Sequence, residues 1–139
     1  MTASIEQRTI SSESASRVLE VARQRAEELG VPMSIAVVDA AGVLKAFHRM
    51  DGAKRLSVDS CQAKAYTAAA SGFPTKQYYE LKKDTPEVVL ISLLPGASAF
   101  GGGHPIVEDG VVIGGVGLGG GSADQDAEIA AAAAAAAIG

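Results

Sequence analysis

Residues 100–126 read FGGGHPIVEDGVVIGGVGLGGGSADQD, and the alternation of β-branched residues and glycines predicts a hairpin in this segment. The turn is expected at Asp109-Gly110, because Asp-Gly between two β-branched runs is the strongest short-range hairpin signal. The many glycines serve one of three purposes: they cradle a phosphate, line another pocket, or let two backbones pack closely.

A nucleotide site is the least compatible of these three. Residues 115–120 satisfy the letters G-x-G-x-x-G, but that fingerprint opens a βαβ unit, and here it follows a hairpin. A Walker loop needs a Gly-Lys-Ser/Thr run, which the segment lacks. Asp124, Asp126 and Glu128 also crowd the start of the next helix, where a phosphate would have to bind. Close packing and the lining of a pocket for another ligand both stay open.

Helices are predicted on both sides of this segment. The first begins at Ser11 or Ser12, ends before Gly30, and has a buried face made of Ala15, Val18, Leu19, Ala22, Ala26 and Leu29. The last begins at Ser122, where Ser122 and Gln125 match a capping box, and includes the alanines at 130–137.

Three more helices are predicted in the middle of the chain. Residues 57–71 are small and helix-compatible, with a polar stripe that is expected to face water: Ser60, Lys64, Thr67 and Ser71. Pro74-Thr75 begins a short amphipathic helix. Thr85-Pro86 begins another over 86–94, although the run VVLISLL also suits a strand.

Residues 33–52, MSIAVVDAAGVLKAFHRMDG, predict a first hairpin with its turn at 39–42. His48 shares one face of the second strand with Leu44, Ala46 and Met50, so we expect a hydrogen-bonded histidine in the core. Helix, hairpin, helices, hairpin and helix together predict an α+β sandwich with a mainly antiparallel sheet, formed by residues 1–139 as a single domain.

Composition and charge restrict the partners. Of the 139 residues, 47% are apolar, but only three are Phe and three Tyr, so the core either packs tightly through small contacts or is completed by a partner subunit. Because its helix faces can bury little surface alone, we predict a homo-oligomer, at least a dimer. The formal net charge of −4 disfavours nucleic acid. The longest apolar run, 129–138, is half of the roughly 20 residues that a membrane span needs, so a cytoplasmic protein without membrane contact is expected.

A few side chains have the chemistry of a functional site. His104 follows three glycines and is expected on an exposed turn, where it either ligates iron or moves a proton, or is an ordinary surface histidine. Lys64 would be a buried cation that meets a ligand carboxylate, or the partner of Asp51 or Asp59 in a salt bridge. The single cysteine, Cys61, lies on the apolar side of its helix and is expected to be buried packing.

Three segments in this order resemble the GlcG/HbpS family, also called haem-degrading or PduO C-terminal-like. They are residues 34–69, SIAVVDAAGVLKAFHRMDGAKRLSVDSCQAKAYTAA, then FGGGHPI at 100–106, and GGVGLGGGSADQD at 114–126. The resemblance implies a profilin- or PAS-like fold with a five-stranded antiparallel sheet flanked by helices, assembled into dimers or larger oligomers. It also implies that haem or a corrinoid binds at or near a subunit interface in some members.

The same resemblance implies which residues line a ligand pocket. Asp126 would orient Lys64 or a ligand hydroxyl, in addition to favouring its helix dipole. Where many relatives have a serine, this chain has Gly119, so one hydroxyl is missing. The pocket residues implied are Met50, Asp51, Gly52, Lys64, Gly102, Gly103, Pro105, Gly120, Gly121 and Asp126.

Three functions follow from these features. The first is an oligomeric protein that binds haem or another tetrapyrrole, with His104 as the iron ligand, in haem handling or degradation. The second is an enzyme that acts on a small organic acid or carbonyl compound in a glycine-lined pocket at a subunit interface, with His104 and Lys64 as catalytic residues. The third is a ligand-free accessory subunit whose glycines serve assembly alone.

Overall fold

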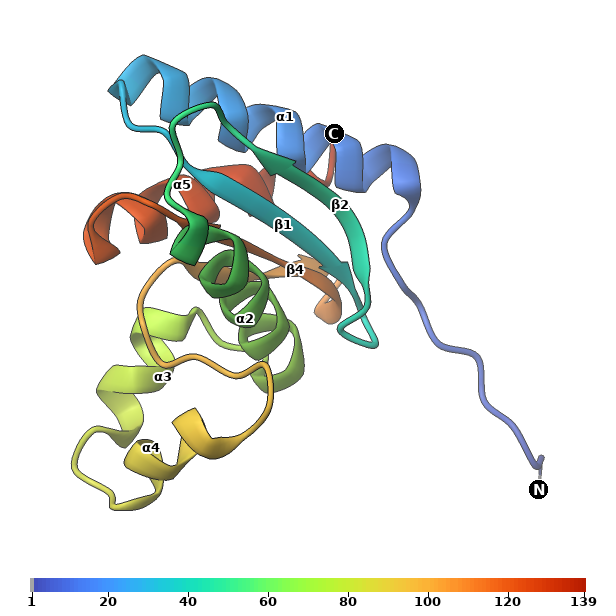
Figure 1. Ribbon diagram of the computed structural model, residues 1–139. Coiled ribbons are helices and arrows are strands. Elements are labelled where there is room, and N and C mark those ends of the chain that lie inside the picture. The colour runs from blue at the N-terminus through green and yellow to red at the C-terminus, as the bar shows by residue number, and fades with distance from the viewer. Residues whose placement is uncertain (1) are drawn as a thin grey trace.

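Helices cover both faces of one antiparallel sheet (Figure 1). The computed structural model describes residues 2–139, except the side chains of residues 88, 89 and 92. On one face lie α1 (Ser12–Leu29) and α5 (Ala123–Ala135), and on the other lies α2 (Arg55–Ser71). The chain then continues beyond α2 through α3 (Thr75–Lys82), α4 (Glu87–Leu90) and the 3-10 helix η1 (Ile91–Leu93).

The described residues form a sheet of four strands. The resemblance implied five strands, so its strand number is wrong, while the antiparallel arrangement is confirmed. The four strands are β1 (Ser34–Asp39), β2 (Leu44–Arg49), β3 (Gly103–Glu108) and β4 (Val111–Gly119), in the order β2-β1-β4-β3. The two predicted hairpins supply all four. The ambiguous run VVLISLL forms α4 and η1 instead of a strand, as Thr85-Pro86 predicts.

Local signals place the turns and helix ends as predicted. Asp109 and Gly110 have φ values of 50° and 78°, the positive values that a type I′ turn needs at both central residues. The Ser11 side chain accepts a hydrogen bond from Ser14 N–H and caps α1. Ser122 and Gln125 form the predicted capping box at the start of α5. The predicted element order is therefore confirmed.

The two faces of the sheet are packed differently. Ile35 and Val37 of β1 point into the main core with α1 and α5, whereas Ala36 and Val38 point into a smaller cluster with Cys61, Ala65 and Ala69 of α2. Alternation along a strand sends successive side chains to opposite faces. The side that faces α2 is therefore lined with small residues, so α2 lies close to the sheet.

Gly115, Gly117 and Gly119 of β4 make this close approach possible. A Cβ at Gly115 would lie 2.5 Å from Ala65 O, and one at Gly117 would lie 2.5 Å from Ala65 N and still nearer to the carbonyl oxygen of Cys61. A Cβ at Gly119 would lie 3.0 Å from Ser57 O. Two residues of a strand advance about 6.7 Å and four residues of a helix about 6 Å. The three glycines, two residues apart on β4, therefore each contact a different, successive turn of α2. For these three glycines, close packing is confirmed.

His48 is exposed, and the prediction that it is a core histidine is wrong. It lies in β2, which is an edge strand of the sheet. Ala46 and Met50 on the same face are half-buried against the core, but the burial does not extend over His48. The alternating pattern of β2 fixes the face of each residue and says nothing of how far the covering helix reaches.

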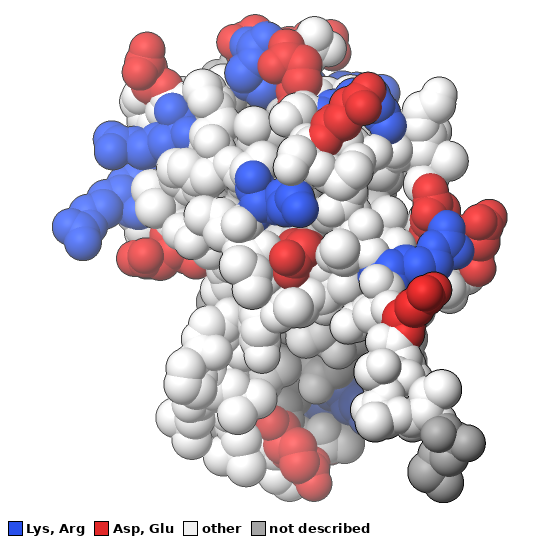
Figure 2. All heavy atoms as spheres, turned by 90° about the vertical axis from the view of Figure 1, so that its right-hand side faces the viewer, with Lys and Arg blue, Asp and Glu red and all other residues white. Residues whose placement is uncertain are grey.

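The surface carries charges of both signs. On the side seen in Figure 2, basic and acidic side chains are interspersed over the upper part, and most of the lower part is uncharged. Within residues 2–139, no helix combines the length and the apolar composition that a membrane span requires.

Candidate ligand-binding site

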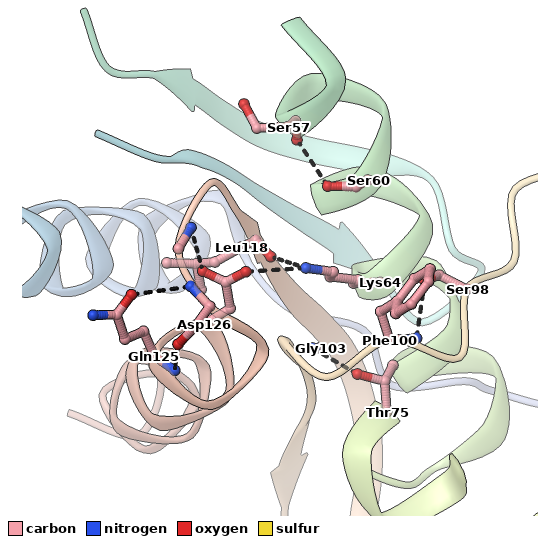
Figure 3. A network of polar contacts seen from close by, with 12 residues as sticks. Ser57, Ser60, Lys64, Thr75, Ser98, Phe100, Gly103, Leu118, Gln125 and Asp126 are labelled. Carbon is pink, nitrogen blue, oxygen red and sulfur yellow. Dashed lines mark hydrogen bonds and ion pairs between the residues drawn. The ribbon is translucent and has the colours of Figure 1, made fainter. Parts of the chain in front are cut away.

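A buried ion pair joins α2 to α5 beside the end of β4 (Figure 3). Lys64 Nζ lies 3.1 Å from Asp126 Oδ2 and donates a second hydrogen bond of 2.9 Å to the carbonyl oxygen of Leu118. Asp126 Oδ1 accepts a 3.0 Å hydrogen bond from Gly121 N–H. Lys64 and Asp126 are only 5% and 1% exposed. Of the partners proposed from sequence for Lys64, Asp126 is the one that the structure shows, not Asp51 or Asp59.

Gly102 and Gly103 leave the space through which this lysine passes. A Cβ at Gly102 would lie 2.8 Å from Asp126 Cβ and 3.0 Å from Lys64 Cδ. One at Gly103 would overlap the carbonyl oxygen of Lys64, and Gly103 N–H donates a 2.9 Å hydrogen bond to Thr75 Oγ1. These two predicted pocket residues therefore pack against Lys64 and do not face open space.

Burial changes the acidity of Asp126 and of Cys61. It raises the pKa of the Asp126 carboxyl above its ordinary value, against the opposing charge and hydrogen bond of Lys64. It also raises the pKa of the Cys61 thiol to about 12. Cys61 is fully buried, which confirms its expected packing role, and its thiol is far from the acidity that a nucleophile needs.

A cavity of about 370 Å³ opens beside the ion pair. Lys64 and Asp126 lie in its wall together with Gly120 and Gly121, so four of the predicted pocket residues are brought together. Its further lining residues are Lys54, Leu56, Ser57, Ser60, Phe100, Gly101 and Ala123. A Cβ at Gly119 would overlap Ser60 Oγ, so the hydroxyl of Ser60 occupies the space beside this glycine.

A second and larger cavity, of about 600 Å³, adjoins the first. The two share Phe100, Gly101 and Ala123, and Phe100 stands between them with 76% of its surface exposed. The second cavity extends along α3 past Lys76, Tyr79 and Glu80, and its other lining residues are Ile91, Ala97, Ser98, Ala99 and Asp124. Together they form one groove from Lys64 to Tyr79. Its two parts are the polar cavity, which has the buried ion pair in its wall, and the apolar cavity, which has the larger apolar surface.

His104 lies apart from both cavities within one chain. It is the second residue of β3, not part of a turn, and is half-buried with Nδ1 2.9 Å from the carbonyl oxygen of Pro105. Gly103 faces α2, so His104 points to the opposite face of the sheet from Lys64. Among the side chains of the described residues, no group of three or more His, Cys, Asp or Glu is placed to hold a metal ion.

The remaining predicted pocket residues also lie elsewhere. Asp51 and Gly52 are exposed in the loop after β2, and Met50 is half-buried against the main core. Pro105 is buried in β3 and lines neither cavity of the groove.

Several residues of the groove were not expected from the sequence. The polar stripe of α2 was predicted to face water, but Thr67 is buried: its Oγ1 donates to Ala63 O at 2.8 Å and accepts from Ser98 N–H at 2.9 Å. The burial of Lys64 agrees instead with the buried cation that was also predicted. The walls formed by Leu56, Tyr79 and Phe100 were missed. The available signal was a large apolar residue directly before the glycines at 101–103.

The sequence has relatives of known name over most of its length. A family model described as "Haem degrading protein HbpS-like" matches residues 10–135. Protein GlcG of Escherichia coli (strain K12) is 36% identical over 109 residues, which cover 78% of this chain and 80% of GlcG.

Solved structures with about the same sequence identity as GlcG share the fold of this chain. A double mutant of HbpS from Streptomyces reticuli superposes with a TM-score of 0.89 at 31% identity, covering 97% of this chain and 91% of that one. A complex of PduOC with haem superposes with a TM-score of 0.84 at 35% identity, covering 92% and 94%. The family model spans nearly the whole chain, and the glycines that it includes hold α2 against β4. The chain therefore belongs to the haem-degrading HbpS-like family.

Proposed function

We propose that this protein binds haem or a related tetrapyrrole in the groove between Tyr79 and Lys64, and acts in haem handling. The observation that carries the proposal is the apolar cavity of about 600 Å³ between α3 and the segment 97–101. A tetrapyrrole needs apolar walls and aromatic contact, and Phe100 and Tyr79 offer exposed rings in this cavity. The solved complex of PduOC with haem supports the same ligand class.

The lining residues fit haem with an oxygen ligand for the iron. Neither cavity has His, Cys or Met among its described lining residues, whereas the Tyr79 phenol lies in the wall of the apolar one. A tyrosine is an established axial ligand of haem iron, and bound haem would supply the redox chemistry of that iron. His104 would reach the groove only from a second subunit.

Haemin titration tests this function. We expect saturable binding at micromolar haemin, with a Soret band that Tyr79→Phe shifts because it removes the axial oxygen. His104→Ala, the matched control, is expected to leave the band in place. A band moved by His104→Ala and not by Tyr79→Phe would assign the iron to the histidine, and the absence of saturable binding would contradict the function itself.

We also infer that the subunits associate, as the sequence predicts. One chain leaves large apolar side chains exposed: Leu56 and Phe100 in the wall of the groove are each 76% exposed, and Leu93, which lines neither cavity of the groove, is 74% exposed. Burying them is favourable by about 25 cal/mol per Å² of apolar surface. Light scattering at micromolar concentration is expected to give at least twice the chain mass of 14.0 kDa, and a monomer mass would contradict association.

A further inference from the structure

Lys64 has one hydrogen-bond donor more than the structure uses. An ammonium group carries three N–H donors, and its acceptors here are Leu118 O at 2.9 Å and Asp126 Oδ2 at 3.1 Å. The third donor has no acceptor among the residues that the structure describes, although Lys64 is 95% buried and lines the polar cavity. A buried donor without a partner is costly, so an acceptor in this cavity would be stabilised.

Ser60 offers a second donor to the same cavity. Its hydroxyl has one contact, with Ser57 O at 3.5 Å, which is at the outer limit of a hydrogen bond. Ser57 is different, because its hydroxyl is engaged by Ser34 Oγ at 2.8 Å and by the carbonyl oxygen of Lys54. Ser60 and Lys64 are four residues apart on α2 and project from the same side of the helix (Figure 3).

The charges around the cavity favour an anion. Its charged lining residues are Lys54, Lys64 and Asp126, which leaves one positive charge in excess. The carboxylate of Asp126 is committed to Lys64 and to Gly121 N–H. A ligand with one negative charge would neutralise the excess positive charge of the cavity lining. Leu56 and Phe100 at its edge supply apolar surface for a short carbon chain.

From these observations we propose that the polar cavity binds a carboxylate, with Lys64 Nζ and Ser60 Oγ donating to its oxygens. The carboxylate belongs either to a small organic acid or to a side arm of a tetrapyrrole. The donors and the charge excess are the same for both, so this site does not rest on the haem proposal.

Titration with sodium propionate, followed by the backbone amide signals of Gly120 and Gly121 in NMR spectra, tests the site. We expect saturable shifts with propionate, and at least about tenfold weaker binding of propionamide, which has the same shape without the charge. Ser60→Ala is expected to weaken propionate binding by about tenfold, because it removes a hydrogen bond to a charged group. Ser71→Ala, on the same helix but outside the cavity, is the control and should leave binding unchanged.

A second arm separates the two sources of the carboxylate. If propionate does not saturate, haemin is compared with haemin dimethyl ester, whose propionates carry no charge. Weaker binding of the ester to the wild type, with a smaller difference in Ser60→Ala because only Lys64 then donates, supports the site with the tetrapyrrole as its source. Three results would overturn the proposal: equal binding of propionate and propionamide, propionate binding that Ser60→Ala leaves unchanged, or a failure of both arms.

Discussion

Replacing Gly117 with alanine is expected to lower the free energy of unfolding by more than about 3 kcal/mol, at the upper end of overpacking effects. The added Cβ would lie 2.5 Å from Ala65 N and nearer still to the carbonyl oxygen of Cys61. Both atoms belong to the backbone of α2, so no side chain can turn aside to make room. The helix has to move away from β4, and its contacts with β1 and β3 weaken as well.

Urea denaturation followed by circular dichroism measures this loss. Gly30→Ala is the matched control, because Gly30 ends α1 with φ at 75° and has no atom within 4 Å of the position of a Cβ. That substitution strains the backbone without a collision and should cost about 1–2 kcal/mol. If Gly117→Ala is no more destabilising than Gly30→Ala, α2 does not lie against β4 as closely as described.

Lys64→Met is the second substitution with a large expected effect. It leaves Asp126 buried with Gly121 N–H as its remaining partner among the described residues. Removing one member of a buried ion pair typically costs about 3–5 kcal/mol, whereas replacing both members with neutral groups of similar size is often close to neutral. The double variant Lys64→Met/Asp126→Asn is therefore expected to recover most of the lost stability.

The same variant is expected to show a changed pH dependence. Burial already raises the pKa of Asp126, and Lys64→Met removes the charge and hydrogen bond that oppose this rise. A carboxyl whose pKa is higher in the folded protein stabilises the fold below its unfolded-state value and loses that contribution as pH rises through the folded-state value. The stability of Lys64→Met should therefore fall as pH rises above about 4.

Denaturation at several pH values separates this effect from a general loss of packing. The double variant has no carboxyl at position 126 and should lack the added slope. Lys76→Met, which removes an exposed ion pair with Asp124, should change stability little at any pH. A Lys64→Met protein with the same pH profile as the double variant would show that Asp126 ionises as readily in the folded protein as in the unfolded chain, which would contradict the raised pKa.

The sequence predicted those parts of the fold that depend on near neighbours. Asp109-Gly110, the Ser11 cap and the Ser122–Gln125 capping box act within four residues, so their chemistry can be read directly from the chain. The sequence could not decide between two roles for the glycines, because close packing and ligand binding both require residues without a side chain. Only the position of α2 assigns Gly115, Gly117 and Gly119 to packing.

The site depended on distances that the sequence does not contain. Lys64 and Asp126 are 62 positions apart, so the residues alone suggested the nearer Asp51 or Asp59 as the ion-pair partner, and only the family resemblance suggested Asp126. His104 was grouped with Lys64 because the glycine-rich loop and the polar stripe of α2 were expected to face one pocket, but alternation along β3 sends His104 to the other face. His48 had an apolar pattern around it, yet β2 is an edge strand.

The strand order β2-β1-β4-β3 also determines when the protein can fold during synthesis. Each hairpin is local and closes within about 1–10 μs, but the two hairpins are joined only through β1 and β4. Asp39 and its partner Gly114 are separated by more than half of the 139 residues. On the ribosome, where the chain grows by about 5–20 residues per second, the edge of β1 stays open for several seconds until β4 emerges. Throughout that interval Ile35 and Val37 lack the core residues of β4 and α5 that bury them in the folded protein. The nascent chain is therefore most prone to aggregate while only its first hairpin has formed.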